Sequence, residues 1–410
     1  MTSNRFIRAI ENQITDLDSK TLKRVLKTIQ GPNDVILKID GKDILSFCSN
    51  DYLGLSNHPD IKSAIKTGLD HFGIGSGASH LISGHSQAHV DLEKKLASFQ
   101  AASIPQAKAL FLSTGYMANL ACITALCASH ENTLIYSDEL NHASLIDGIR
   151  LAGAQSHVEK HIYPHDDLVQ LESLLSTKPV ANNQNTLSLI VTDGVFSMDG
   201  DMADAKGLLH LAQKYDALLL IDDAHGFGVL GTKGYGILEE NDISSARIIY
   251  MGTLGKAAGI SGAFIVAHES ITEWIIQKAR SYIYTTAAPP ALSYGLLTSL
   301  NIIDAQDGAK RRVHLNHLIT YFKKNITLRR WKVVSSNTPI QPIIIGSNEE
   351  ALKITEELKK LGLYIPAIRP PTVPVNTARL RITFSAAHSI EQVQYLINSL
   401  HQIEAELESI

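Results

Sequence analysis

Short apolar runs alternate with helix-like patterns from about residue 107 onward. Each run is bounded by Gly, Asp or Ser. Continuous apolar runs are typical of strands that are buried on both faces, and such strands with helices between them form mostly parallel sheets. The pattern therefore predicts an α/β fold with a mostly parallel, doubly wound sheet and helices on both of its faces. The predicted strands are KALFLS (108–113), NTLIYS (132–137), LSLIVTD (187–193), ALLLID (217–222), ARIIYMG (246–252) and AFIVA (263–267).

The carboxyl ends of these predicted strands carry polar residues. Doubly wound sheets bind their ligands in the crevice outside those ends. Here they carry Ser113-Thr114-Gly115, Asp193, Asp222 and Thr253. We therefore expect the chemistry of the protein at this edge of the sheet.

A change of pattern after Pro289-Pro290 marks the expected domain boundary. The chain has 410 residues, which suits two domains. Beyond the two prolines the order becomes helix, short strands, helix, with a second Pro-rich segment at 368–374. We expect a large domain over residues 46–289 and a smaller α+β domain over residues 290–410.

Residues 1–45 form the remaining predicted region, an N-terminal helical arm. Apolar side chains at helical spacing predict one amphipathic helix or two over residues 5–29, and the Gly31–Asp34 cluster ends the pattern. Such an arm packs on the body of the protein or on a partner subunit, or it is a solvated helix that only adds stability. The repeating residues are Ile7, Ile10, Ile14, Leu17, Leu22, Val25, Leu26 and Ile29.

Composition and charge narrow the class of protein. Hydrophobic residues make up 44% and charged residues 19%, and the net charge is −4. This mix is typical of soluble globular proteins, and without a basic stripe it argues against nucleic-acid binding. No apolar run is long enough for a membrane span, and the N-terminus does not resemble a secretory signal. Cys48, Cys122 and Cys127 are odd in number and lack C-x-x-C spacing. We therefore expect a cytoplasmic protein without a disulfide framework or a metal site.

Three local features carry candidate chemistry. Asp222-Asp223-Ala224-His225 follows a buried strand, where a carboxylate needs a cationic partner, although a loop or capping acid would look the same. Lys256 follows the next strand among small residues, although a surface lysine is the simpler interpretation of it alone. Residues 113–119 join a strand to a helix, so that backbone N–H groups and the helix dipole would face an anion, although an ordinary turn would also fit.

Taken together, the three features match the needs of pyridoxal phosphate. That cofactor is tethered to a lysine as a Schiff base, and a carboxylate keeps its pyridine nitrogen protonated so that the ring accepts electrons. Its phosphate needs an anion site. The combination therefore predicts a pyridoxal-phosphate enzyme with Lys256 as the tether.

Over nearly its whole length the sequence resembles the α-oxoamine synthases. These enzymes belong to the fold-type I, aspartate-aminotransferase-like group of pyridoxal-phosphate transferases. Many matches in the same order make the resemblance specific. They are SNDYLGLSNHP (49–59), GIGSGASHLISGH (73–85), STGYMAN (113–119), NHASLIDGI (141–149), GVFSMDGD (194–201), IDDAHGFGVLG (221–231), MGTLGKA (251–257), SGAF (261–264) and ARLRIT (378–383).

The resemblance implies roles for individual residues. Lys256 would hold the cofactor and move the α-proton, and Asp222 would pair with the pyridinium nitrogen. His225 and Ser197 would bind the ring oxygen, and His142 would stack on the ring and contact substrate. Gly115, Tyr116 and Thr253 would hold the phosphate, with Tyr116 replacing the Phe of many relatives at little cost to stacking. Arg24, Thr372 and Arg381 would contact substrate, and Asn50 and Thr286 are weaker candidates near the ring or the facing subunit.

The resemblance also implies a reaction. The segment IRPPTVP (368–374) and the DDAHG form look most like the branch that joins L-alanine to a pimeloyl thioester, on coenzyme A or on an acyl-carrier protein, with loss of CO2. The alternatives are 5-aminolevulinate synthase, 2-amino-3-ketobutyrate ligase and serine palmitoyltransferase, then an aminotransferase, then a non-catalytic partner subunit. A homodimer is implied, in which segments 73–79 and 282–286 would meet from opposite chains.

Two other patterns are set aside. Gly226-Phe-Gly228-Val-Leu-Gly231 fits the dinucleotide motif G-x-G-x-x-G, but the acids precede the glycines instead of following them. His85 and His89, and likewise His157, His161 and His165, have zinc-like spacing without an H-E-x-x-H glutamate. Surface or capping histidines are the favoured interpretation.

Overall fold

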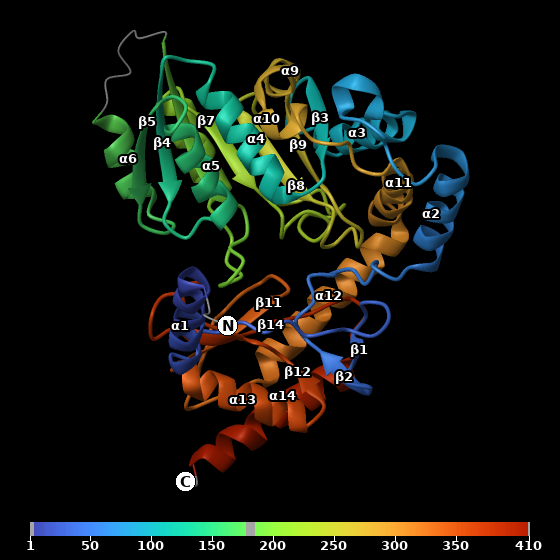
Figure 1. The fold of residues 1–410 in the computed structure, drawn as a ribbon, viewed down its shortest axis with the longest axis vertical. Helices are drawn as coiled ribbons and strands as arrows, with labels where there is room; N and C mark the ends of the chain where they lie inside the picture. Colours follow the sequence, from blue (N-terminus) through green and yellow to red (C-terminus); the bar gives the residue numbers. More distant parts are fainter. Residues whose placement is uncertain (1–3, 178–184, 409–410) are drawn as a thin grey trace. The chain divides into compact units, whose positions relative to one another are not determined.

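The computed structural model describes residues 4–177 and 185–408 and divides into two compact units (Figure 1). The larger unit is Asn50–Leu315, and the smaller one combines Met1–Ser49 with Asn316–Ile410. The division differs from the boundary expected near residue 290, because α11 (Pro290–Asp304) packs on α2 (Pro59–Phe72) of the larger unit. This packing is close, since a Cβ added at Gly68 would lie 3.0 Å from the Cα of Ala291.

A seven-stranded sheet forms the centre of the larger unit. Its order is β3-β9-β8-β7-β6-β4-β5, and β9 runs antiparallel to both neighbours while the other pairs are parallel. The structure confirms the mostly parallel α/β sheet and all six strands predicted from apolar runs. The apolar runs did not reveal β5, which lies at the edge of the sheet and therefore mixes polar and apolar residues. The strands are β3 Ala107–Leu112, β4 Asn132–Asp138, β5 His157–Tyr163, β6 Thr186–Asp193, β7 Leu218–Asp222, β8 Ile248–Thr253 and β9 Ala263–His268.

Helices follow most of these strands. In Figure 1, α4 (Gly115–Cys127) and α5 (Ala143–Gly153) cover one face of the sheet, and they pack on each other and share a core with β3, β6 and β8. A helix that follows a parallel strand begins beside that strand's carboxyl end. The remaining helices are η1 His80–Gly84 (a π-helix), α3 Gln87–Gln100, α6 Leu168–Ser176, α7 Ala205–Lys214, α8 Ile237–Glu240, α9 Glu269–Lys278, α10 Arg280–Ile283 and α12 Gln306–Asn325.

The smaller unit is α+β, with two small sheets. One sheet has the order β1-β2-β12 and the other β10-β11-β14-β13. The parallel pairing of Leu45 with Leu363 joins the N-terminal segment to the C-terminal region, so the expected arm over 1–45 is not a separate region. The elements are β1 Ile36–Ile39, β2 Lys42–Ser46, β10 Lys332–Val333, β11 Ile340–Gly346, β12 Leu363–Tyr364, β13 Ala367–Ile368, β14 Ala378–Thr383, α1 Arg5–Ser19, α13 Asn348–Lys360 and α14 Ile390–Glu408.

The N-terminal segment corrects one prediction. The first expected helix forms as α1, but residues 22–28 are not helical and Ile29 instead bridges to Ile39 of β1. Thr21 adopts a positive φ of 54°, which ends the helical path. The prediction of a second helix was therefore wrong, because apolar spacing alone does not reveal that Ile29 pairs with a strand.

Two segments that were expected to meet from opposite chains meet within one chain. Ser79 forms an isolated antiparallel bridge with Thr286, and the N–H of Ala287 donates to the carbonyl oxygen of Ala78. The Ser76 hydroxyl also donates to the carbonyl oxygen of Ala288 at 2.6 Å. Segments 73–79 and 282–286 thus adjoin within one chain, and their expected contact across two chains stays a prediction.

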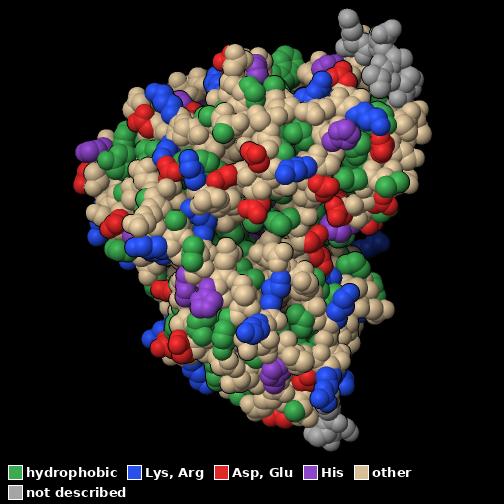
Figure 2. Space-filling model, turned by 180° about the vertical axis from the view of Figure 1, so that it is seen from behind, with side chains coloured by type: hydrophobic (Ala, Val, Ile, Leu, Met, Phe, Trp, Pro, Cys, Tyr) green, Lys and Arg blue, Asp and Glu red, His purple; other side chains and the backbone are tan. Residues whose placement is uncertain are grey.

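On the face shown in Figure 2, acidic and basic side chains are interspersed. Across the described ranges, no helix combines the length and the apolar character needed to cross a membrane.

Candidate active site

A cavity of about 200 Å³ lies at the carboxyl ends of β6, β7 and β8. Eight residues singled out in the sequence as cofactor ligands line it together, although they are spread over 142 positions from 115 to 256. They are Gly115, Tyr116, His142, Ser197, Asp222, His225, Thr253 and Lys256. Ser144, Asp193, Val195, Ala224 and Met251 complete the lining.

The parallel sheet explains why these residues converge. Asp193 and Asp222 are the last residues of β6 and β7 and are register partners, and Thr253 ends β8. Gly115 is the first residue of α4, and His142 is the N-cap of α5. Parallel strands present their carboxyl ends at one edge, so residues distant in sequence share one site.

Asp222 is held as a buried carboxylate. Only 5% of the residue is exposed. One oxygen accepts a hydrogen bond from Asn119 Nδ2 at 2.7 Å, and the other accepts from the N–H of Ala224 at 3.0 Å. These two donors hold the carboxyl group of Asp222 in a fixed position at the cavity wall.

The neighbouring acid, Asp223, does not line the cavity. Its carboxyl group accepts hydrogen bonds from Ile237 N at 2.7 Å and from the Tyr250 hydroxyl at 2.8 Å, inside the core. Burial raises the pKa of Asp223 to about 7. Of the two adjacent acids, geometry therefore selects Asp222 for the site.

Lys256 lies in a chain of hydrogen bonds. Its Nζ is 2.7 Å from His225 Nε2, and His225 Nδ1 is 2.5 Å from the Tyr52 hydroxyl. A Cβ added at Gly255 would meet nothing closer than 3.8 Å, which leaves room beside the lysine. The lysine amine is thus oriented by an imidazole and has space for a bulky group.

His142 and Asp193 add two more buried ionisable groups. His142 Nδ1 is 2.7 Å from the Ser144 hydroxyl, and burial lowers the pKa of its imidazole despite Asp222 nearby. Burial, followed by the neighbouring Asp222, raises the pKa of Asp193 well above its usual value. Asp193 Oδ1 is buried and has no hydrogen-bond partner in the part of the chain that the structure describes. The lining therefore contains one carboxyl group still able to take a donor.

The N-terminus of α4 has the backbone donors that an anion site needs. Thr114 caps the helix by accepting from Met117 N at 3.2 Å, and the first N–H groups of any α-helix lack a partner within it. Thr253 Oγ1 donates to the carbonyl oxygen of Gly262 at 3.1 Å. Gly115, Tyr116 and Thr253 all line the cavity, where the first backbone N–H groups of α4 are the available donors.

Tyr116 makes a contact that a phenylalanine could not make. Its hydroxyl donates a hydrogen bond to Asp147, which also pairs with Arg150 at 3.0 Å. The sequence indicated only a small change in stacking at this position. The structure adds an anchor that fixes the ring to α5.

These features fit pyridoxal phosphate. A lysine amine, a buried carboxylate, a flat imidazole and a helix N-terminus meet in one cavity, and a buried carboxyl oxygen there lacks a donor. Each matches one chemical need of the cofactor: a tether, a partner for the ring nitrogen, a face to stack on and a phosphate site. Lys256, Asp222, His142 and the residues of the α4 turn would hold the group.

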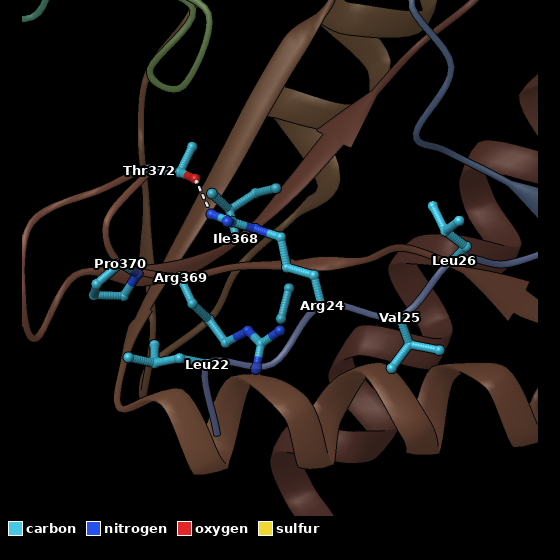
Figure 3. A pocket seen from close by; sticks show the side chains of 9 residues that line it. Leu22, Arg24, Val25, Leu26, Ile368, Arg369, Pro370 and Thr372 are labelled. Atoms are coloured by element: carbon cyan, nitrogen blue, oxygen red, sulfur yellow. Dashed lines mark hydrogen bonds between the residues drawn. The ribbon is translucent and has the colours of Figure 1, made fainter. Parts of the chain in front are cut away.

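The expected substrate contacts lie elsewhere. Arg24 and Thr372 line a cavity of about 380 Å³ in the smaller unit, together with Arg369 (Figure 3). Arg24 Nη2 is 3.5 Å from the Thr372 hydroxyl, and Arg369 donates to the carbonyl oxygen of Thr21. Burial, and next the positive charge of Arg24, lowers the pKa of Arg369. Two cationic side chains beside apolar ones make this cavity suited to an anion on an apolar chain.

The other expected contacts are spread over both units. Arg381 lies buried on β14 and donates to the Thr383 hydroxyl at 3.2 Å. Asn50 begins the larger unit, where its Oδ1 accepts from the Tyr52 hydroxyl at 3.3 Å. Thr286 pairs with Ser79. None of the three is among the residues that line the cavity around Lys256.

The histidines with zinc-like spacing have structural partners. His89 is buried and accepts a hydrogen bond from Ser86 N, completing a capping box on α3. His165 lies between Asp138 and Asp201, and these two carboxylates raise the pKa of its imidazole to about 10. Within the described residues, no cluster of His, Cys, Asp or Glu is arranged to hold a metal ion.

Asn119, Ser144, Asp193 and Tyr52 support the site but were not assigned roles from the sequence. Asn119 Nδ2 binds both Asp222 and the Ser144 hydroxyl, at 2.7 and 2.8 Å. Asn119 and Tyr52 lie inside segments that resemble the family, which was the one available signal. Their contacts cross 103 and 173 positions of sequence, which local patterns do not reveal.

Comparisons with known proteins agree with this geometry. The family described as aminotransferase class I and II matches residues 42–400. The chain is 51% identical to an 8-amino-7-oxononanoate synthase of Janthinobacterium sp. (strain Marseille), covering 98% of this chain and 99% of that one. The serine palmitoyltransferase of S. paucimobilis, solved with pyridoxal phosphate and myriocin bound, is 26% identical with a TM-score of 0.86 over 98% of both chains. The 8-amino-7-oxononanoate synthase of Francisella tularensis is 31% identical with a TM-score of 0.73, covering 89% of this chain and 98% of that one.

Proposed function

The chain belongs to the aminotransferase class I and II family of pyridoxal-phosphate enzymes, and we propose that it catalyses the reaction of its 8-amino-7-oxononanoate synthase relatives. In that reaction L-alanine condenses with a pimeloyl thioester to give 8-amino-7-oxononanoate, CO2 and the free thiol, a step of biotin synthesis. The observation that carries the proposal is the joint placement of Lys256 and Asp222 in one cavity beside the N-terminus of α4.

Pyridoxal phosphate, when bound, supplies an electron sink that stabilises negative charge on the carbon next to the amino group. Lys256 would hold the cofactor and would accept the α-proton of the substrate on its Nζ. His225, 2.7 Å from that nitrogen, orients the amine. Groups that stabilise charge only along the reaction path are the ones that accelerate it.

Asp222 and His142 prepare the site for the ring. The carboxylate of Asp222 would keep a proton on the ring nitrogen, and the donors on Asn119 and Ala224 hold that carboxylate in place. The lowered pKa of His142 keeps its imidazole neutral, which suits a flat stacking face. Ser197 and His225 bind the ring oxygen.

The cavity of the smaller unit supports the choice of acyl group. A pimeloyl chain is apolar and ends in a carboxylate, and this cavity joins Leu22, Val25 and Ile368 to the guanidinium groups of Arg24 and Arg369 (Figure 3). Arg369 and Thr372 would bind the terminal carboxylate. Arg381, whose planar guanidinium suits bidentate contact, would bind the carboxylate of L-alanine.

An arginine variant tests this assignment. Wild type should prefer pimeloyl-coenzyme A over heptanoyl-coenzyme A, which has the same chain length without the carboxylate. Arg369→Met should reduce that preference about 10- to 100-fold, since a charged hydrogen bond is worth about 1.5–3 kcal/mol. The exposed Arg329 in the same unit gives the matched control, Arg329→Met. An unchanged preference in Arg369→Met would move the carboxylate site elsewhere.

Subunit assembly follows from exposed apolar side chains. Ile74 is 83% exposed, Ile82 80% and Tyr284 72%, on segments joined by the Ser79–Thr286 bridge. Large exposed apolar side chains on adjoining segments favour an interface, and we propose a homodimer. We also propose that the enzyme works in the cytoplasm, where Cys48 and the two buried cysteines, all unpaired in the structure, stay reduced.

One experiment tests the reaction itself. Purified protein is incubated with pyridoxal phosphate, L-alanine and pimeloyl-coenzyme A or the pimeloyl acyl-carrier protein, and the product is identified by mass spectrometry. We expect 8-amino-7-oxononanoate, and growth without biotin when the gene is given to a bacterium that lacks this step. Efficient condensation of glycine with acetyl-coenzyme A, and no rescue of growth, would instead place the chain with the 2-amino-3-ketobutyrate ligases.

A further inference from the structure

His165 joins two segments that both lead to the candidate active site. Its Nδ1 lies 3.2 Å from both carboxyl oxygens of Asp138, the last residue of β4, and its Nε2 lies 2.7 Å from Asp201 Oδ2. An ionised carboxylate only accepts hydrogen bonds, so both ring nitrogens donate and the imidazole carries a positive charge. The same two carboxylates raise the pKa of His165 to about 10, which agrees with that charge. We call these three side chains the histidine clamp.

The Asp138 end of the histidine clamp begins the turn that leads to His142. Asp138 is 3% exposed, and its carboxyl group also accepts from the N–H of Leu140 at 2.8 Å. Asn141 ties the same turn to β6, because its Nδ2 donates to the carbonyl oxygen of Val191 at 2.8 Å. His142 follows directly, caps α5 and lines the cavity. This end of the clamp is therefore fixed to the central sheet.

The Asp201 end of the histidine clamp belongs to a hairpin that carries Ser197. Val195 forms an isolated antiparallel bridge with Met202, and the N–H of Phe196 donates to the carbonyl oxygen of Asp201 at 3.0 Å. Ser197 follows at the tip and lines the cavity. Asp201 Oδ1 is buried without a hydrogen-bond partner in the described part of the chain, where its Oδ2 accepts from His165. The carboxyl group of Asp201 therefore connects the hairpin to His165.

We propose that His165 is a positioning residue that fastens the Ser197 hairpin to the carboxyl end of β4. The proposal rests on the proposed function, in which Ser197 binds the ring oxygen of the cofactor while His142 stacks on the ring. Both contacts require a constant spacing between the β4 turn and the hairpin, and the histidine clamp spans that spacing. Residues 197–200 have further interactions of their own, so loss of the clamp should loosen the hairpin without unfolding the protein.

Amide hydrogen exchange of the cofactor-free protein measures the fastening itself. In His165→Gln, the new side chain has no charge and one nitrogen where the imidazole has two. Asp201→Ala removes the hairpin end of the clamp and leaves His165 paired with Asp138. Both variants should speed exchange about tenfold at the amides of Phe196 and Ala203, which are hydrogen-bonded inside the hairpin, since a charged hydrogen bond that held it is lost.

Lys95→Gln is the matched control. Lys95 pairs with Asp304 at 2.8 Å, and the exposure of both side chains is close to that of His165 and Asp201. This pair joins α3 to α11, and neither residue lines the cavity. The control should leave exchange in the hairpin unchanged.

A double-mutant cycle on cofactor affinity tests whether His165 acts through Ser197. His165→Gln alone should weaken the binding of pyridoxal phosphate about tenfold. In a Ser197→Ala background the same change should cost less than about twofold, because the contact that His165 positions is already gone. Visible circular dichroism of the bound cofactor, which depends on the orientation of its ring, should change in His165→Gln and stay as in wild type in Lys95→Gln.

The outcomes separate this proposal from the proposed function. Wild-type exchange in the hairpin of both His165→Gln and Asp201→Ala would overturn the proposal. Equal losses of affinity with and without Ser197 would overturn it too, because His165 would then act on stability alone. If His165→Gln does not fold, Asp201→Ala decides on both measurements, since the Asp201 side chain is 35% exposed. A wild type that binds no pyridoxal phosphate would refute the proposed function, and exchange in the hairpin would then decide the role of His165 by itself.

Discussion

Replacing Asp222 by Asn should separate the charge of this side chain from its shape. The two carboxylate oxygens accept from different donors, Asn119 Nδ2 at 2.7 Å and Ala224 N at 3.0 Å. An amide has one acceptor oxygen, so in either orientation one buried donor faces an NH2 group. This mismatch should lower the free energy of unfolding of the cofactor-free protein by about 1–3 kcal/mol.

The larger effect should be on the cofactor. Removing one partner of a buried ion pair costs about 3–5 kcal/mol, which corresponds to a loss of about 100- to 5,000-fold in affinity for pyridoxal phosphate. Equilibrium dialysis measures that affinity, and urea unfolding measures the stability. Turnover should fall at saturating cofactor as well, because the ring nitrogen loses its proton.

Asp223→Asn is the matched control. Asp223 is equally buried, but it accepts from Ile237 N and the Tyr250 hydroxyl and does not line the cavity. The control should change stability while cofactor affinity stays within about threefold, well below the loss of about 100-fold expected for a buried ion pair. Near-normal affinity and turnover in Asp222→Asn, or loss of the cofactor in Asp223→Asn, would show that the wrong acid was chosen.

Three further predictions concern other parts of the chain. The protein should be yellow with its cofactor, and Lys256→Ala should no longer be labelled when borohydride fixes pyridoxal to the chain; a label that persists would refute the tether. Ile82→Glu should yield monomers by light scattering. The control Val169→Glu, at a residue of α6 that is 81% exposed, should not. A fully active wild-type monomer would contradict the dimer. His165→Gln should destabilise the protein at pH 6 and much less at pH 10. The pKa of His165 is about 10 in the folded protein and near 6.5 in the unfolded chain, so its contribution to stability is present below pH 6.5 and is lost as the pH rises through 10. Equal urea midpoints for wild type and variant at pH 6 would show that the charge of His165 does not stabilise the fold.

The strands of the central sheet were predictable because burial on both faces requires continuous apolar runs. β7 and β8 are examples, and each is almost wholly buried. β5 escaped the same reasoning because it lies at the sheet edge, where polar and apolar positions mix. The prediction of a helix after Thr21 was wrong for a different reason, since the apolar spacing suits a helix while Ile29 pairs with Ile39 of the following strand β1.

The site was predictable to the extent that its residues sit in ordered motifs. Lys256 and Asp222 were placed at strand ends by local pattern alone, and the resemblance added His142 and His225. The support behind them was not predictable, because Asn119 reaches Asp222 across 103 positions. No local pattern encodes such a contact.

The sequence by itself predicted the order of most strands and helices, the strand-end position of the candidate site and Lys256 as the proposed tether. Those properties depend on local periodicity and on residues next to one another in the chain. The resemblance had selected Asp222, but only the tertiary structure shows that Asp222 lines the cavity while Asp223 accepts from Ile237 N, and that Tyr52 contacts His225. The reason is that adjacent residues at a strand end point to opposite sides, and the groups that fill each side come from distant segments.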